Sequence, residues 1–242
     1  MKNFREFCLY EFINTREIDP KRFQNPGKKG DVAFFKRGFL DGLIKDDIVR
    51  SKEINISANK LKPSQTSVFL GKSLDMAVRG YYGGDLGSIV SSDLRILDGH
   101  HRWAATVFAN PTEILTCTQL DMTIGDLIPV LRQAGDILGN TRGVEPDGGD
   151  INIFEATIED AEECILTGKG FPEKNWNLEK AKEWFEKNRD NVSKALEFFK
   201  KTTPPAGALP REQMPKIKKD QVDSVERILN RGGIDVRTPY AE

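Results

Sequence analysis

The sequence has few of the residues that build the commonest metal and disulfide sites. It has two histidines in 242 residues, and its three cysteines, Cys8, Cys117 and Cys164, are far apart with no C-x-x-C pair. A structural zinc site needs four converging Cys or His ligands, so a zinc ribbon or finger is excluded. An odd number of scattered cysteines argues against a disulfide scaffold and indicates a reducing compartment.

Long apolar runs and an excess of one charge are also missing. No apolar run approaches the about 20 residues of a membrane span, so we expect no transmembrane helix and no export through a signal peptide. The 36 Lys and Arg residues nearly balance 37 Asp and Glu, which removes the simplest reason to expect nonspecific nucleic-acid binding. The best local basic patch is 211–219 (REQMPKIKK), which we interpret as a solvated charge run with a DNA contact as the alternative.

The spacing of apolar residues predicts an α+β chain, in which strands and helices follow one another before a C-terminal helical region. The expected strands lie at 54–56, 88–91, 94–97 and 113–120. A glycine-rich loop is expected at 80–87. The expected helices lie at 65–78, 100–109, 123–138, 155–167, 178–188, 190–201 and near 219–230.

The strongest boundary signal is the D-G-G-D stretch at 147–150. With the Pro-rich linker at 202–210, it divides the chain into regions of different character. These are an N-terminal helix at 1–11, an extension at 12–51, a sheet domain at 52–139, a helical region at 151–201, and a C-terminal helix and tail at 211–242.

The densest functional signal is the stretch LRILDGHHRWAA at 94–105, where a strand, a turn and a helix follow one another. Gly99 permits a tight turn, and the N–H groups of the new helix favour an anion in that turn. Arg102 can bind two anionic oxygens at once, and His100 and His101 stand beside it. Asp98 could hold a divalent cation, orient a histidine or accept a proton. We therefore predict a phosphate site; the alternative is that Asp98 only caps the helix and Arg102 only makes an ion pair.

Gly99, Arg102 and Ala105 match the G-x-x-R-x-x-A signature of ParB-like proteins, and about 52–122 resembles the ParB/sulfiredoxin superfamily. The resemblance implies a sulfiredoxin-like mixed sheet and a nucleotide site at 98–102. Gly99, His101 and Arg102 also match the sulfiredoxin G-G-C-H-R motif, but His100 replaces the catalytic cysteine. Reduction of sulfinic acids is therefore not expected.

Asp98 to Arg102 is also similar to an Asp-Gly-His-His-Arg stretch of free serine kinases that have this fold. Those kinases carry a catalytic glutamate just after the first strand, where this chain has Gln65, which cannot act as a general base. The resemblance further implies ATP, ADP or CTP as ligand, with Mg²⁺ held by Asp98, and a possible homodimer. It places Lys72, Gly83, Gly84 and Asp85 around the site.

The first eleven residues, MKNFREFCLYE, place Phe4, Phe7 and Cys8 at helical spacing. They resemble the capsid-targeting peptides of T-even-like phages, which are cleaved after a Leu-x-Glu tripeptide such as Leu9-Tyr10-Glu11. This resemblance implies a phage source, processing at Glu11, phage head components as partners, and a location in the host cytoplasm or the virion interior. An ordinary N-terminal helix is the alternative.

These observations leave three functional hypotheses. The first is a phosphotransferase or nucleotide hydrolase in which Arg102 holds phosphate, His100 or His101 acts as acid, base or charge stabiliser, and Asp98 binds Mg²⁺ or orients the acceptor. The second is a non-catalytic DNA-binding or virion-internal protein that contacts DNA through 211–219. The third is a ParB-like nuclease, which would need a second carboxylate such as Asp85 or Asp93 near Asp98.

Overall fold

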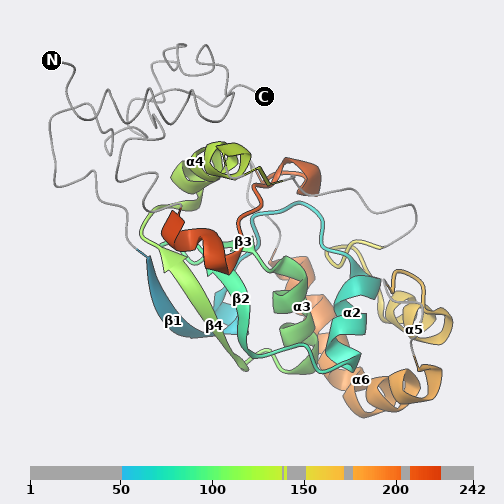
Figure 1. Ribbon diagram of the computed structural model, residues 1–242. Helices are drawn as coiled ribbons and strands as arrows, with labels where there is room; N and C mark the ends of the chain where they lie inside the picture. Colours follow the sequence, from blue (N-terminus) through green and yellow to red (C-terminus); the bar gives the residue numbers. More distant parts are fainter. Residues whose placement is uncertain (1–50, 138, 141–150, 172–176, 203–207, 225–242) are drawn as a thin grey trace, which may run out of the picture.

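The computed structural model describes residues 51–137, 139–140, 151–171, 177–202 and 208–224 (Figure 1). The predicted N-terminal helix with Glu11, nearly all of the extension 12–51 and the boundary at 147–150 lie outside these residues. So does the predicted C-terminal helix beyond residue 224. The predictions for those segments therefore stay predictions.

The described residues form an α+β fold around a four-stranded mixed sheet, which confirms the predicted fold class (Figure 1). The strands are β1 Ser51–Ser57, β2 Gly84–Val90, β3 Ile96–Asp98 and β4 Ile114–Leu120. Their order in the sheet is β1-β4-β2-β3. The β2–β4 pair is parallel, and the β1–β4 and β2–β3 pairs are antiparallel.

The helices are α2 Leu70–Val78, α3 His100–Ala109, α4 Ile124–Ile137, α5 Ile158–Thr167 and α6 Leu178–Lys201, with short 3₁₀ turns η3 Ala58–Lys60, η4 Arg211–Gln213 and η5 Lys219–Gln221. The two helices expected at 178–188 and 190–201 form the single helix α6, since neither Gly nor Pro interrupts the stretch. In the part of the chain that the structure describes, no helix combines the length and apolar character needed to cross a membrane.

Two of the element boundaries that differ from the sequence-based expectation have a clear cause in tertiary pairing. The helix expected from residue 65 begins at Leu70, because Gln65 and Phe69 form isolated β-bridges with Leu209 and Asn152. The second half of the glycine-rich loop expected at 80–87 belongs to a strand, because β2 begins at Gly84 and pairs with β4 from that residue on. Tertiary pairing thus overrides local propensity at both places.

The core lies where α3 packs between the sheet and α6. Trp103 and Phe108 of α3 are fully buried and each meets Phe199 of α6 edge-on, with ring centroids 5.2 Å apart. The indole Nε1 of Trp103 also donates a hydrogen bond of 2.9 Å to the carbonyl of Ala58. The expected sheet domain and helical region therefore share one hydrophobic core, and α3 is held rigidly at its centre.

The C-terminal residues 208–221, which we call the strap, return to the sheet domain (Figure 1). The N–H of Leu209 donates to the carbonyl of Ser64, and the N–H of Thr66 donates back to the carbonyl of Leu209 at 2.9 Å. At the other end, the Lys219 ammonium is paired with Asp85 of β2. The strap is therefore tied both to the chain before α2 and to the sheet.

Candidate functional site

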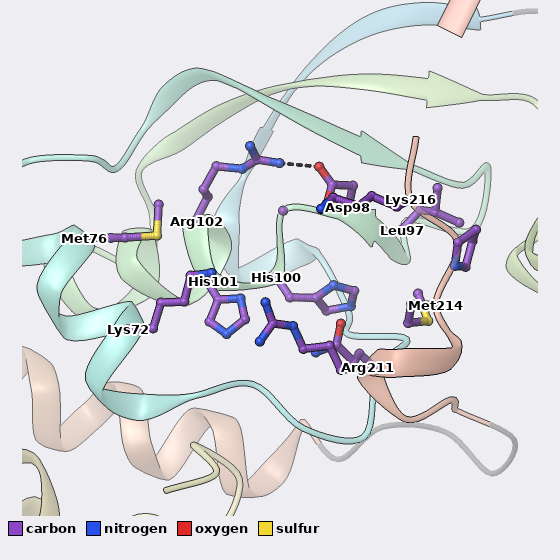
Figure 2. A pocket seen from close by; sticks show the side chains of 13 residues that line it. Lys72, Met76, Leu97, Asp98, His100, His101, Arg102, Arg211, Met214 and Lys216 are labelled. Carbon is purple, nitrogen blue, oxygen red and sulfur yellow. Dashed lines mark hydrogen bonds and ion pairs between the residues drawn. The ribbon is translucent and has the colours of Figure 1, made fainter. Parts of the chain in front are cut away.

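A cavity of about 330 Å³ opens at the start of α3. Its walls come from three parts of the chain: the β3–α3 junction, helix α2, and the strap (Figure 2). The first of these is the strand–turn–helix that the sequence predicts as a phosphate site. β3 ends at Asp98, one residue beyond the expected strand, and α3 begins at His100, as expected.

Gly99 makes this sharp connection possible. Its φ of +104° is a backbone conformation that side-chain-bearing residues rarely adopt, and a Cβ there would lie 2.6 Å from the Ser88 Oγ. Gly99 is itself the N-cap of α3 and no side chain caps the helix, so the alternative that Asp98 caps it is wrong. Because the first N–H groups of a helix have no intrahelical partner, this helix start favours an anion.

Arg102 points back from the first turn of α3 toward β3. Its Nη2 lies 2.5 Å from the Asp98 Oδ2, so the ion pair that we considered as an alternative is present (Figure 2). The pair is partly exposed and lines the cavity. The buried Nε of Arg102 has no hydrogen-bond partner among the described residues. The guanidinium thus keeps a donor that the protein does not satisfy, which is unusual for a buried polar atom.

The two histidines are held by backbone N–H groups. The Nε2 of His100 accepts a hydrogen bond of 3.2 Å from Ser64, and the Nε2 of His101 accepts one of 3.2 Å from Phe69. A nitrogen that accepts a hydrogen bond carries no proton, so each ring has its proton on Nδ1. The Phe69 ring also packs against the His101 ring, with centroids 5.6 Å apart.

Burial and neighbouring cations keep both imidazoles neutral. Burial, followed by the charges of Arg102 and Arg211, lowers the pKa of His100 to about 3. Burial and the charge of Lys72 hold the pKa of His101 well below its usual range. Both rings are therefore neutral at pH 7 in this conformation, and the acid, base or charge-stabilising role considered for them stays a prediction.

Four cationic side chains converge on the cavity: Lys72 of α2, Arg102 of α3, and Arg211 and Lys216 of the strap (Figure 2). Burial and the charges of Arg211, Lys216 and Arg102 lower the pKa of Lys72, while Asp98 opposes this shift. Among the described residues that line the cavity, Asp98 is the only carboxylate. The site therefore carries a clear surplus of positive charge.

Arg211 and Lys216 are the site residues that the sequence analysis missed. The basic run 211–219 was interpreted as a solvated charge run or a DNA contact, because nothing local links it to α3. In the structure these two side chains line the cavity, whereas Lys219 pairs with Asp85 and lies 3.9 Å from Glu53. The signal in the sequence was the presence of two apolar residues, Met214 and Ile217, within a basic run. The structure shows that both of these residues are buried.

The other predicted site residues divide into two groups. Lys72 and Gln65 line the cavity as the resemblance implies. Gly83, Gly84 and Asp85 lie outside the residues that line it: the Gly83 N–H donates to the Thr106 Oγ1 at 3.1 Å, and Gly84 and Asp85 belong to β2.

The structure offers one carboxylate for a divalent cation. Among the described residues, no group of three or more His, Cys, Asp or Glu side chains is arranged to hold a metal. Asp93, considered as a second carboxylate, pairs with Arg95 at 3.4 Å and accepts a hydrogen bond from the Ile124 N–H. A Mg²⁺ ion that arrives with a nucleotide keeps several waters and needs only one or two protein carboxylates, so Asp98 is the residue that would contact it.

Comparison of the chain with protein-family models, with curated proteins and with solved structures finds no match in any of the three. The ParB/sulfiredoxin resemblance is thus neither supported nor opposed by these comparisons.

Proposed function

We propose that the protein binds a nucleotide through its phosphate groups in the cavity at the start of α3. One observation carries this proposal: four cationic side chains and a helix N-terminus converge on a single cavity with one carboxylate. Arginine and lysine are the side chains that bind phosphate oxygens most strongly, and a helix start adds N–H donors and partial positive charge. Arg102 and the first turn of α3 hold one phosphate group.

The rest of the cavity lining suits the uncharged part of a nucleotide. Met76, Leu97, Met214 and Pro215 add apolar surface to a lining that is otherwise mostly polar and charged. Apolar surface beside convergent polar groups is common in ligand pockets. The G-x-x-R signature at a strand–helix junction on a mixed sheet is also what the ParB/sulfiredoxin resemblance implies, and we propose that the chain is a distant member of that superfamily.

The chemistry we propose for this site is transfer or hydrolysis of a phosphoryl group. Such reactions depend mainly on positioning and on stabilising the charge of the transferred group. Arg102 and Lys72 supply positive charge, and the neutral histidines hold the Ser64 and Phe69 backbone in place beside it. Asp98 is the carboxylate that orients an attacking water or hydroxyl, or contacts a Mg²⁺ ion bound with the nucleotide.

Titration calorimetry with ATP, ADP and CTP, with and without Mg²⁺, tests the binding proposal. We expect at least one nucleotide to bind the wild-type protein. Arg102→Gln should weaken that binding about tenfold to hundredfold, because a charge-assisted hydrogen bond contributes about 1.5–3 kcal/mol.

Arg189→Gln is the matched control, since Arg189 is a half-exposed arginine of α6 that pairs with Glu162 at 2.9 Å and does not line the cavity. Its nucleotide affinity should equal that of the wild type. The proposal fails if no nucleotide binds the wild-type protein, or if the two variants bind alike.

A further inference from the structure

The strap is fixed against the domain along its length. Met214 and Ile217 are buried, at 4% and 1% exposure. The Arg132 Nε of α4 donates a hydrogen bond of 2.9 Å to the carbonyl of Gln213, and the Asn140 Nδ2 donates one of 2.7 Å to the carbonyl of Lys216. The residues between these anchors therefore have a defined place on the cavity wall.

Arg211 stacks on an aromatic ring that also contacts a histidine lining the cavity. Its guanidinium lies over the Phe69 ring, 5.2 Å from the centroid, and the same ring packs against His101. A guanidinium over an aromatic face is attracted by the electron-rich ring, which helps to hold it in that position. Figure 2 shows Arg211 entering from the strap while Lys72 enters from α2, with the two histidines between the start of α3 and these cations.

The charge balance of the cavity exceeds what one phosphate group can neutralise. Counting only the described side chains that line the cavity, four cations and one carboxylate sum to a formal charge of +3. A phosphate group carries about 1.5 to 2 negative charges at neutral pH. The cations also repel one another. Besides burial, the positive charges of Arg211, Lys216 and Arg102 lower the pKa of Lys72. Two of the four, Arg211 and Lys216, come from the strap.

We propose that the strap is the second half of the binding site, in which Arg211 and Lys216 hold a second phosphate group of the ligand. The site then takes a diphosphate or triphosphate chain in preference to a single phosphate group. This inference rests on the proposed nucleotide binding, and it adds that residues outside the sheet domain determine the number of phosphates recognised.

Calorimetry with inorganic orthophosphate and pyrophosphate on the full chain, in buffer without Mg²⁺, tests the inference. The wild-type protein should bind pyrophosphate at least tenfold more tightly than orthophosphate. Lys216→Gln removes an exposed strap cation, and it should weaken pyrophosphate binding about tenfold while changing orthophosphate binding less than twofold. Lys218→Gln is the matched control, because this exposed lysine lies two residues further along the strap and does not line the cavity.

Each outcome separates this inference from the proposed function. Equal affinity for orthophosphate and pyrophosphate overturns the inference but is compatible with a site for a single phosphate group. An equal effect of Lys216→Gln and Lys218→Gln on pyrophosphate binding has the same meaning. No binding of either anion, together with no binding of ATP, ADP or CTP, overturns the proposed function and the inference with it. Slower amide hydrogen exchange at 209–214 on adding pyrophosphate, but not on adding orthophosphate, is a second expected result; unchanged exchange there counts against the strap as a ligand contact.

Discussion

Acid should destabilise this protein through its buried histidines before most of its carboxylates titrate. The folded state holds the pKa of His100 at about 3, whereas the unfolded chain has the ordinary value of 6.5. Between these two values the unfolded state binds a proton that the folded state excludes. The free energy of unfolding is therefore highest above pH 6.5 and falls as the pH is lowered toward 3.

The size of this effect follows from the two pKa values. Lowering the pH from 8 to 4.5 should cost about 2–3 kcal/mol through His100 alone, since each pH unit inside the window contributes a little over 1 kcal/mol. His101 adds to the loss in the same direction, because its pKa is also lowered. The cause is structural: protonating either Nε2 breaks a hydrogen bond from a backbone N–H beside the cations of the cavity.

The assay is urea unfolding of the wild type and of His100→Gln at pH 8, 6 and 4.5. Glutamine can still accept the hydrogen bond from Ser64 but does not titrate, so the stability lost between pH 8 and 4.5 should be about 2–3 kcal/mol smaller in the variant. The carboxylates are common to both proteins and cancel in this difference. The same pH dependence in both proteins, or a His100 NMR signal that titrates near pH 6.5, would refute the reasoning.

Three further predictions concern the junction and the helices around it. Gly99→Ala should lower the free energy of unfolding by at least about 2 kcal/mol, because it combines a positive φ with a Cβ contact of 2.6 Å to the Ser88 Oγ; unchanged urea unfolding would contradict this. Asp98→Asn should strengthen nucleotide binding without Mg²⁺ a fewfold in calorimetry, because Arg102 no longer pairs with a carboxylate that competes with the phosphate. The same substitution should abolish any phosphate release or transfer. Weaker nucleotide binding by the variant would contradict the idea that Asp98 competes with phosphate for Arg102. Thr157→Ala should cost about 1 kcal/mol and lower the melting temperature by about 2–4 °C, because Thr157 and Asp160 cap α5 reciprocally; an unchanged melting curve would show that the cap contributes nothing.

The secondary structure of the β3–α3 junction was predictable because it is local in sequence. Asp98, Gly99 and Arg102 lie within five positions, and the strand, turn and helix follow directly from that stretch. The charge state of the histidines was not predictable. It depends on backbone N–H groups of Ser64 and Phe69, which a sequence pattern cannot place.

The strap shows where prediction from sequence fails for a physical reason. Arg211 and Lys216 line the cavity because Leu209 forms a β-bridge with Gln65 and because Met214 and Ile217 are buried against the domain. These contacts join residues far apart in the sequence, so no local sequence pattern indicates them. The position of Gln65 was predicted from the resemblance and lines the cavity, but its backbone forms a β-bridge where a helix was expected.

The sequence predicted which helices and strands form better than it predicted where each of them begins and ends. Helix α3 has the predicted bounds, since Gly99 and the Asn110–Pro111 step limit it on both sides. Strand β2 is longer than predicted, because its pairing with β4 recruits Gly84 and Asp85 despite their low strand propensity. The sequence suggested two helices where α6 is continuous, since its apolar face continues through Val192 to Phe199.

A crystal structure of the full chain grown with saturating ADP tests the central claim most directly. We predict that one phosphate group lies at the start of α3, within hydrogen-bond distance of Arg102 and of a first-turn N–H group. The second phosphate group should lie toward Arg211 and Lys216. ADP bound elsewhere on the protein, or an unliganded cavity at a nucleotide concentration that saturates binding in solution, would contradict the claim.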